Sequence, residues 1–210
     1  MKLVGVGVGP GDPEHITLKA LRALREADRV FVPDGGRAAE IVSAHVECEP
    51  LTFAMTDIGS REAHWERAAA RISEIDGIAA FATIGDPNLY STFGYVAQAV
   101  RRLAPDVVIE TIPGITAMQD LAARSGTTLA EGDERLALVP YTAGDGALRE
   151  ALESFETVIV YKGGRRLPDV LRAVEDAGRQ AVYGEELGRP GETLTPPDGA
   201  APYFSTVIAR

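Results

Sequence analysis

The amino-acid sequence predicts an α/β fold built from two α/β domains. Short runs rich in valine and isoleucine recur along the 210 residues and alternate with longer stretches of helical periodicity. This alternation is typical of parallel strands joined by crossover helices. The spacing of the elements loosens after about residue 112, and the stretch 188–202 holds four prolines before a last apolar run. We therefore expect an N-terminal domain over residues 1–112 and a C-terminal domain over residues 113–210.

The expected strands are apolar runs bounded by turn-forming or charged residues. They lie at residues 2–8, 29–32, 77–83, 106–112, 135–139, 157–161, 180–185 and 203–209. The first run has no extended basic leader and turns at once into a Gly-Pro-Gly-Asp-Pro loop, so we interpret it as a strand rather than a signal peptide. No stretch reaches the roughly 18 apolar residues that a membrane span requires.

Helical periodicity is clearest in residues 13–27, where apolar side chains share one face and charged side chains lie elsewhere. That face consists of Ile16, Ala20, Ala23, Leu24 and Ala27. Asp12 is the expected N-cap of this helix, and Pro13 its first residue. Further helices are expected at residues 37–45, 60–75, 88–103, 116–124, 147–153 and 167–177. Gly178 follows the last of them at the position of a C-terminal cap.

Composition and charge exclude several functional classes. The formal net charge is -10, which disfavours a nucleic-acid partner because phosphate binding needs a basic surface. Cys48 is the only cysteine, so no internal disulfide or cysteine-rich metal site is expected, and a reducing cytoplasm fits. The three histidines show no ligand spacing and predict no metal site; they are His15, His45 and His64.

The loop after the first strand is the first candidate for a ligand site. Its glycine spacing does not match the dinucleotide-binding fingerprint: the position of the third glycine holds Pro10 when the motif is counted from Gly5, and Asp12 when it is counted from Gly7. The chain also lacks the Gly-Lys pair of a phosphate-binding loop. On spacing alone, a capped turn without function is the favoured explanation of the loop.

Two further turns favour the functional interpretation. Gly85-Asp86-Pro87 again follows an apolar strand, and residues 113–117 follow the next one. Because the carboxyl ends of parallel strands meet at one sheet edge, we expect all three turns to lie together where open α/β sheets bind ligands.

These turns resemble those of the tetrapyrrole methylases of the cobalamin and sirohaem pathways. The resemblance runs over nearly the whole chain and is carried by residues 7–20, 85–87 and 113–117. Within the family, the precorrin-2 C20-methyltransferase branch is the most similar. The residues that indicate this branch are 53–56, Trp65, 85–93, 129–137, 161–162 and 202–205, although Ala54 stands where the branch commonly has proline.

The resemblance implies a homodimer of two-domain subunits. The N-terminal sheet would be mainly parallel and the C-terminal sheet mixed, with S-adenosylmethionine bound in the cleft between the domains and no protein-bound metal. Carried over by motif, the cofactor-binding residues would be Pro10, Ile84, Gly85, Asp86, Leu89, Tyr90, Ser91, Thr116, Ala117, Lys162 and Tyr183.

The implied reaction makes few demands on acid or base groups. The donor's methyl group is already activated on a sulfonium, so alignment is the main task. Asp86 is interpreted as a cap and cofactor ligand rather than a base; Tyr90 is the one weakly motivated candidate base, and a packing role explains it equally well. Arginine suits the substrate carboxylates, and the candidates are Arg37, Arg61, Arg165 and Arg166.

Two alternatives stay open at this stage. One is another methylase of the same family, acting on a later precorrin or on uroporphyrinogen. The other is a non-catalytic sensor that binds S-adenosylmethionine and transfers nothing. The sequence does not say whether the tetrapyrrole substrate would be metal-free or would carry cobalt.

Overall fold

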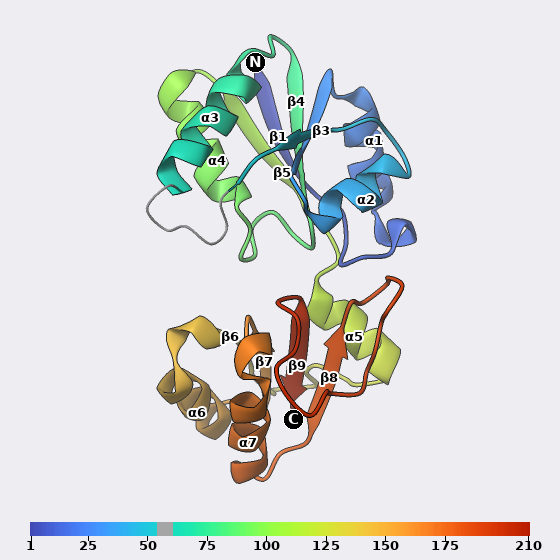
Figure 1. The fold of residues 1–210 in the computed structure, drawn as a ribbon, viewed down its shortest axis with the longest axis vertical. Helices are drawn as coiled ribbons and strands as arrows, with labels where there is room; N and C mark the ends of the chain where they lie inside the picture. Colours follow the sequence, from blue (N-terminus) through green and yellow to red (C-terminus); the bar gives the residue numbers. More distant parts are fainter. Residues whose placement is uncertain (54–60) are drawn as a thin grey trace. The chain divides into compact units, whose positions relative to one another are not determined.

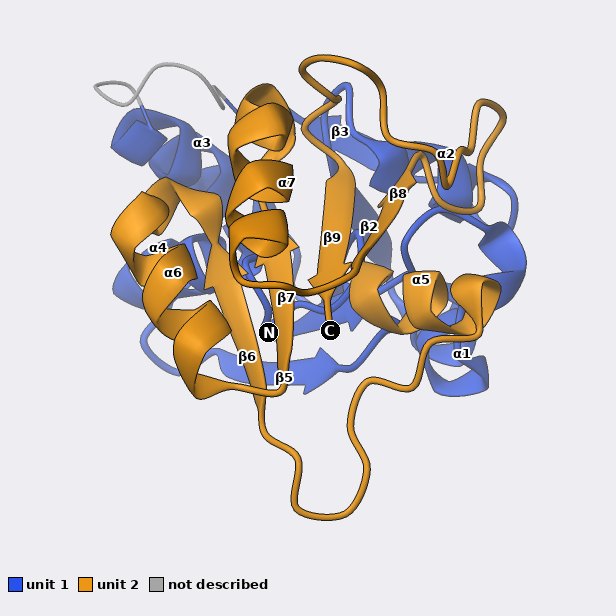
Figure 2. Cartoon of the chain, turned by 90° about the horizontal axis from the view of Figure 1, so that it is seen from below, with its two compact units in different colours: residues 1–116 blue, residues 117–210 orange. Residues whose placement is uncertain are grey.

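A computed structural model describes residues 1–53 and 61–210. The chain divides into two compact units, Met1–Thr116 and Ala117–Arg210 (Figures 1 and 2). The division falls four residues after the one expected at 112. Residues 54–56 of the branch motif, Ala54 among them, and the expected start of a helix at residue 60 lie outside the described residues.

Unit 1 contains an all-parallel sheet of five strands in the order β3-β2-β4-β1-β5. The strands are β1 (Lys2–Gly7), β2 (Arg29–Pro33), β3 (Glu49–Leu51), β4 (Ile78–Thr83) and β5 (Val108–Ile112). Strands β1 and β4 are buried on both faces, which explains their continuous apolar sequences. Strand β3 was not predicted, because Glu49-Pro50-Leu51 is too short and too polar to form an apolar run.

Helices cover both faces of this sheet (Figure 1). Helices α1 (Leu18–Glu26) and α2 (Arg37–Ser43) lie on one face, and α3 (Arg61–Ser73) and α4 (Phe93–Leu103) on the other. The neighbours Leu3 and Val4 point to opposite faces: Leu3 joins the core under α3 and α4, and Val4 joins the core under α1 and α2. The alternation of side chains along a strand is the cause.

Two helices begin later than predicted. Asp12 caps only a short 3-10 turn, η1 (Pro13–His15), by accepting a hydrogen bond from the Glu14 N–H at 2.9 Å. Helix α1 starts at Leu18 and is capped by Thr17, whose hydroxyl accepts from the Ala20 N–H at 3.1 Å. The expectation that Asp12 caps this helix was therefore wrong.

The helix expected from residue 88 begins at Phe93. Tyr90 has a φ of 52°, and this left-handed conformation cannot continue a right-handed helix. The turn at Gly85-Asp86-Pro87 therefore leads into a loop before the helix starts.

Unit 2 contains a mixed sheet, as the resemblance implies, and its strands lie in the order β6-β7-β9-β8. Its strands are β6 (Leu136–Pro140), β7 (Thr157–Tyr161), β8 (Ala181–Glu185) and β9 (Ser205–Ala209). Strands β6 and β7 are parallel, and β9 runs antiparallel to β7 and β8. The α/β class and the two kinds of sheet are thus confirmed.

The helices of unit 2 are α5 (Ala117–Ser125), α6 (Asp145–Ser154) and α7 (Leu167–Asp176), with 3-10 turns η3 (Tyr141–Ala143) and η4 (Gly164–Arg166). Helices α6 and α7 share one core with the sheet, and α5 packs in a second core that contains Ile159 and Ile208. Gly178 ends α7 with a φ of 69°, as predicted for a C-terminal cap. No helix in the described parts of the chain is long and apolar enough to cross a membrane.

Candidate functional site

Three turns meet at the carboxyl edge of the unit 1 sheet. Strand β1 lies between β4 and β5, with Gly7 paired to Thr83 and Val6 paired to Ile112. The turns after the three strands must therefore begin side by side. The connection after β1 runs through α1 on one face of the sheet, and the connection after β4 runs through α4 on the other face. The strand order therefore reverses between β1 and β4. Open α/β sheets bind ligands at such a point.

The three turns are in direct backbone contact. A Cβ atom placed on Gly7 would lie 2.5 Å from the Gly114 nitrogen and 2.5 Å from the Gly85 carbonyl oxygen, and a Cβ on Gly114 would lie 2.1 Å from that same oxygen. The Gly85 N–H also donates to the Gly9 carbonyl at 2.8 Å. Only glycine at positions 7 and 114 allows this approach.

The Asp86 carboxylate holds two of the turns together. One oxygen accepts a hydrogen bond from the Asn88 N–H at 2.8 Å, and the other accepts from the Gly114 N–H at 3.1 Å. The Asn88 side chain in turn donates to the Thr111 hydroxyl at 3.1 Å. With both oxygens engaged by backbone donors, Asp86 is suited to fix the turns and poorly suited to act as a base.

The edge has open space at Gly85, which has a φ of 65°. A Cβ atom added there would meet no atom within 4 Å. Hydroxyl groups lie on the same loops: the Thr83 and Ser91 oxygens are 3.0 Å apart, and Thr116 is 8% exposed. Backbone groups, hydroxyls and the apolar side chains of Ile84 and Leu89 suit an uncharged heterocycle with a ribose, so this edge fits the adenosine part of S-adenosylmethionine.

Tyr90 is the weak catalytic candidate, and 45% of it is exposed. Partial burial raises the pKa of its hydroxyl. A raised pKa keeps the group protonated at neutral pH, which favours hydrogen bonding over proton abstraction.

The remaining expected cofactor residues belong to unit 2. Ala117 begins α5, where the neighbouring Met118 N–H donates to the Tyr161 hydroxyl at 2.9 Å. Lys162 follows β7 with a φ of 59°. Tyr183 is 2% exposed and donates to Glu185, and burial is the main cause that raises its pKa. Their grouping with the turns of unit 1 stays a prediction.

The expected substrate arginines occupy different places. Arg37 and Arg61 begin α2 and α3, respectively. Arg165 and Arg166 lie in η4, where they share a pocket of about 380 Å³ with Lys162. The other residues lining this pocket are Tyr141, Thr142, Gly144 and Asp145. The sequence did not identify this grouping, because the loops 141–145 and 162–166 meet only through the pairing of β6 with β7.

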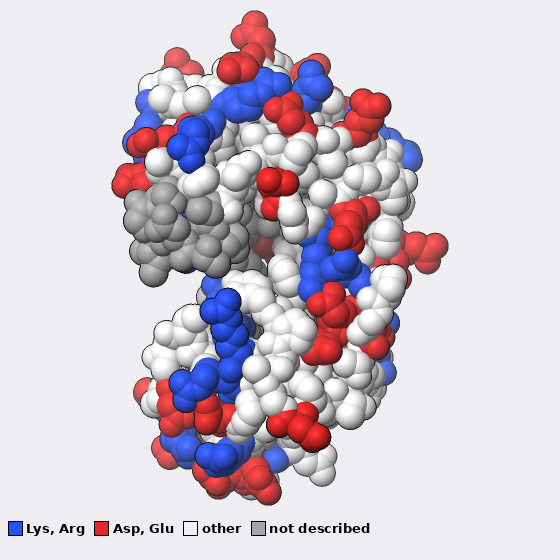
Figure 3. All heavy atoms as spheres, viewed as in Figure 1, with Lys and Arg blue, Asp and Glu red and all other residues white. Residues whose placement is uncertain are grey.

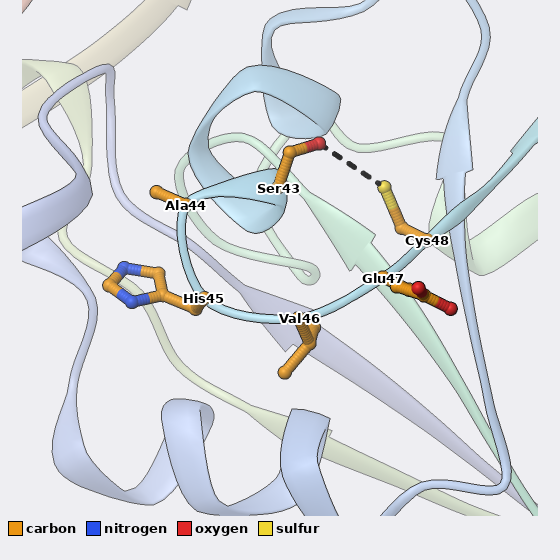
Figure 4. A pocket seen from close by; sticks show the side chains of 6 residues that line it. All are labelled: Ser43, Ala44, His45, Val46, Glu47 and Cys48. Atoms are coloured by element: carbon orange, nitrogen blue, oxygen red, sulfur yellow. Dashed lines mark hydrogen bonds between the residues drawn. The ribbon is translucent and has the colours of Figure 1, made fainter.

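A second pocket follows α2 and is lined by residues 43–48 (Figure 4). The Ser43 oxygen lies 3.7 Å from the Cys48 sulfur, and the His45 ring contacts the Pro13 carbonyl at 3.1 Å. The side chains of His45, Val46 and Glu47 do not converge on a point in Figure 4. Among residues 1–53 and 61–210 no group of histidine, cysteine and acidic side chains is arranged to hold a metal ion.

Comparisons with known proteins agree with this geometry. The family model of the tetrapyrrole (corrin/porphyrin) methylases matches residues 2–200. A precorrin-2 C(20)-methyltransferase from a Sinorhizobium species is 33% identical, over 99% of this chain and 94% of its own length. A cobalt-precorrin-2 C(20)-methyltransferase from Salmonella typhimurium is 28% identical, over 100% of this chain and 96% of its own.

A solved structure has the same fold. It is the uroporphyrin-III C-methyltransferase from Thermus thermophilus in complex with S-adenosylhomocysteine, which superimposes with a TM-score of 0.74 at 22% identity and covers 100% of this chain and 97% of that one. At this identity the likeness establishes the fold alone. Together with the family model and the full-length relatives, it completes the assignment: the chain belongs to the tetrapyrrole (corrin/porphyrin) methylase family.

Proposed function

We propose that this chain is an S-adenosylmethionine-dependent methyltransferase that methylates precorrin-2, or its cobalt form, at C20 to give the corresponding precorrin-3A. The observation that carries the proposal is the full-length similarity to relatives that bear this activity in their names. The converging turns of unit 1 support it, because they provide a compact ligand-binding edge without a dinucleotide fingerprint.

The proposed cofactor site draws on both units. From unit 1 it takes Pro10, Ile84, Gly85, Asp86, Leu89, Tyr90, Ser91 and Thr116, and from unit 2 Ala117, Lys162 and Tyr183. The open side of Gly85 supports the first group. When bound, S-adenosylmethionine supplies a methyl group that is already activated on a sulfonium sulfur.

The chain's own contribution is alignment. Holding the acceptor carbon in line with the methyl group is worth about 7–11 kcal/mol of the barrier in well-oriented systems. Asp86 serves this by locking the turns after β4 and β5. Burial raises the pKa of the Tyr90 hydroxyl, so Tyr90 is proposed to hydrogen-bond the substrate, and the proton that C20 loses passes to water. Arg37, Arg61, Arg165 and Arg166 are proposed to bind the substrate carboxylates.

We further propose that the protein works as a cytoplasmic homodimer. The edge strand β5 supports self-association, since Val108 on it is 54% exposed and an open edge of a sheet offers unpaired backbone groups. Sedimentation velocity checks this: a single species of twice the chain mass is expected, and a monomer at micromolar concentration contradicts it.

The decisive assay offers the purified protein three acceptors under anaerobic conditions: precorrin-2, cobalt-precorrin-2 and uroporphyrinogen III. We expect methyl transfer to one or both forms of precorrin-2 and none to uroporphyrinogen. Transfer to uroporphyrinogen would favour a different methylase of the family. Calorimetric binding of S-adenosylmethionine without transfer to any tetrapyrrole would favour a sensor.

A further inference from the structure

The pocket lined by Lys162, Arg165 and Arg166 lies at a carboxyl edge of its own, within unit 2. Strands β6 and β7 are parallel neighbours that end at Pro140 and Tyr161. The pocket is formed by the loops that follow these two strands. It therefore occupies, in unit 2, the type of position where parallel strands present loops to a ligand.

Two helix N-termini also point to this pocket. Helix α6 begins after Gly144 and helix α7 after Arg166, and neither N-cap residue makes a side-chain capping hydrogen bond. The first turn of α6 therefore presents N–H groups and a partial positive charge, whereas in α7 the Leu167 N–H already donates to the Gly164 carbonyl and Pro168 has no N–H. Asp145 opposes this charge in α6, but it is paired with Arg149 at 2.8 Å.

Three cations line the pocket beside the start of α6, which already carries positive potential. Arg166 pairs with Asp169, whereas Arg165 is exposed and has no ion-pair partner within the described ranges 1–53 and 61–210. Basic side chains beside a helix N-terminus are unfavourable unless an anion is present. Figure 3 shows basic side chains gathered on unit 2 near the beginnings of α6 and α7, although the whole chain has a net charge of -10.

We propose that Lys162, Arg165 and Arg166 form one carboxylate-binding subsite that holds acidic side chains of the tetrapyrrole substrate. The inference rests on the proposed function for the identity of the substrate. It adds Lys162, which also stands in the proposed cofactor site, to the substrate-binding residues, because Lys162 lines one pocket with the two arginines. The volume of about 380 Å³ is at the low end of the roughly 300–1,000 Å³ of small-molecule sites and suits acid side chains rather than a whole macrocycle. Planar guanidinium groups bind carboxylates through paired hydrogen bonds.

A carboxylate could reach this pocket from two sources, the tetrapyrrole or the methionine end of the cofactor. Binding measurements distinguish these two sources of the carboxylate without a turnover assay. The tetrapyrrole probe is sirohydrochlorin, the oxidised form of precorrin-2, followed by its absorbance; the cofactor probe is S-adenosylhomocysteine, followed by calorimetry. The variants are Arg165→Gln/Arg166→Gln and Lys162→Met. The matched control is Arg172→Gln, which removes an exposed arginine from the adjoining helix α7, outside the pocket.

We expect the double variant to bind sirohydrochlorin at least about tenfold more weakly, because charge-assisted hydrogen bonds are lost. Lys162→Met should weaken it in the same direction, while Arg165→Gln/Arg166→Gln and Arg172→Gln bind S-adenosylhomocysteine as the wild type does. Added salt should weaken sirohydrochlorin binding more in the wild type than in the double variant.

Two results would overturn the subsite. One is a double variant that melts like the wild type and binds sirohydrochlorin with unchanged affinity. The other is a wild-type protein that does not bind sirohydrochlorin. Weaker S-adenosylhomocysteine binding by the double variant would assign the pocket to the cofactor and also overturn it. Pocket-dependent sirohydrochlorin binding by a protein that transfers no methyl group to precorrin-2 would support the subsite and contradict the proposed function.

Discussion

The Asp86 carboxylate accepts a hydrogen bond from the Gly114 backbone N–H at 3.1 Å, across 28 residues of sequence. This bond ties the turn after β4 to the turn after β5, over the end of β1 between them. The side chain most naturally interpreted as a local turn cap thus also fixes the geometry of the whole ligand-binding edge. The predictions for unit 1 follow from this arrangement.

Replacing Asp86 with alanine should weaken S-adenosylmethionine binding by about tenfold or more while the fold survives. Two backbone N–H groups lose their acceptor: the partly buried Gly114 N–H costs about 1–3 kcal/mol, whereas the exposed Asn88 N–H can bond to water. Calorimetric titration with S-adenosylhomocysteine measures the first effect, and thermal unfolding the second.

Asp28→Ala is the matched control for this experiment. The Asp28 carboxylate also accepts a backbone hydrogen bond between segments, from the Ile78 N–H at 2.7 Å, but at the opposite, amino edge of the sheet. Both variants should lose stability, and only Asp86→Ala should lose cofactor affinity. Equal affinities in the two folded variants would contradict the role given to Asp86.

Gly114→Ala should destabilise unit 1 and abolish tight cofactor binding. The new Cβ would lie 2.1 Å from the Gly85 carbonyl oxygen, so the turns must separate, at about 1–3 kcal/mol. Gly94→Ala is the comparison, because a Cβ there meets nothing within 4 Å; it should leave binding intact and stabilise by about 0.4–1 kcal/mol. Urea unfolding measures the change in stability of both variants. A Gly114→Ala variant as stable as the wild type would show that the turns do not touch.

The stability of unit 2 should fall in acid through Glu156. Hydrogen bonds from Arg135 lower the pKa of this carboxyl from 4.5 to about 2. A folded-state pKa below the unfolded one means that the contribution is complete above pH 4.5 and is lost as the pH falls toward about 2. Glu156→Gln should therefore melt lower than wild type at pH 7, with the difference shrinking across that window. A difference that stays constant from pH 7 to pH 2 would contradict the shift.

The fluorescence of Trp65, the single tryptophan, reports on the contact between α3 and α4. The Trp65 and Tyr95 rings stack with centroids 4.4 Å apart and planes 5° from parallel. Tyr95→Leu should expose Trp65, shift its emission to longer wavelength and cost about 0.5–1.5 kcal/mol beyond the change in buried area. Tyr95→Phe keeps the ring, so its emission should match the wild type; a shift of equal size in both variants would assign the effect to the hydroxyl.

Much of the fold followed from the sequence because buried parallel strands are recognisable as continuous apolar runs. The strand that was not predicted, β3, has no such run. Helix starts were less predictable. Asp12 and Asp86 both looked like helix caps, yet each caps a tight turn, because the chain needs several more residues before its next helix can begin.

The site was predictable as far as strand order allowed. Adjacent parallel strands place the turns containing Gly7, Gly85 and Gly114 at one edge, and the structure confirms that these turns meet. The pocket around Lys162 was not foreseen, since local sequence does not reveal that η3 and η4 adjoin. Arg165 and Arg166 were candidates for the substrate carboxylates because arginine suits carboxylates and both lie in or beside a predicted loop; the structure adds the start of α6 at the same pocket.

The most direct test of the central claim follows an isotopically labelled methyl group from S-adenosylmethionine into precorrin-2. The product is analysed by mass spectrometry and carbon NMR. The proposed function predicts a single added methyl group whose label resides at C20. A label at any other ring carbon, or none in the macrocycle while the protein binds the cofactor, would contradict it.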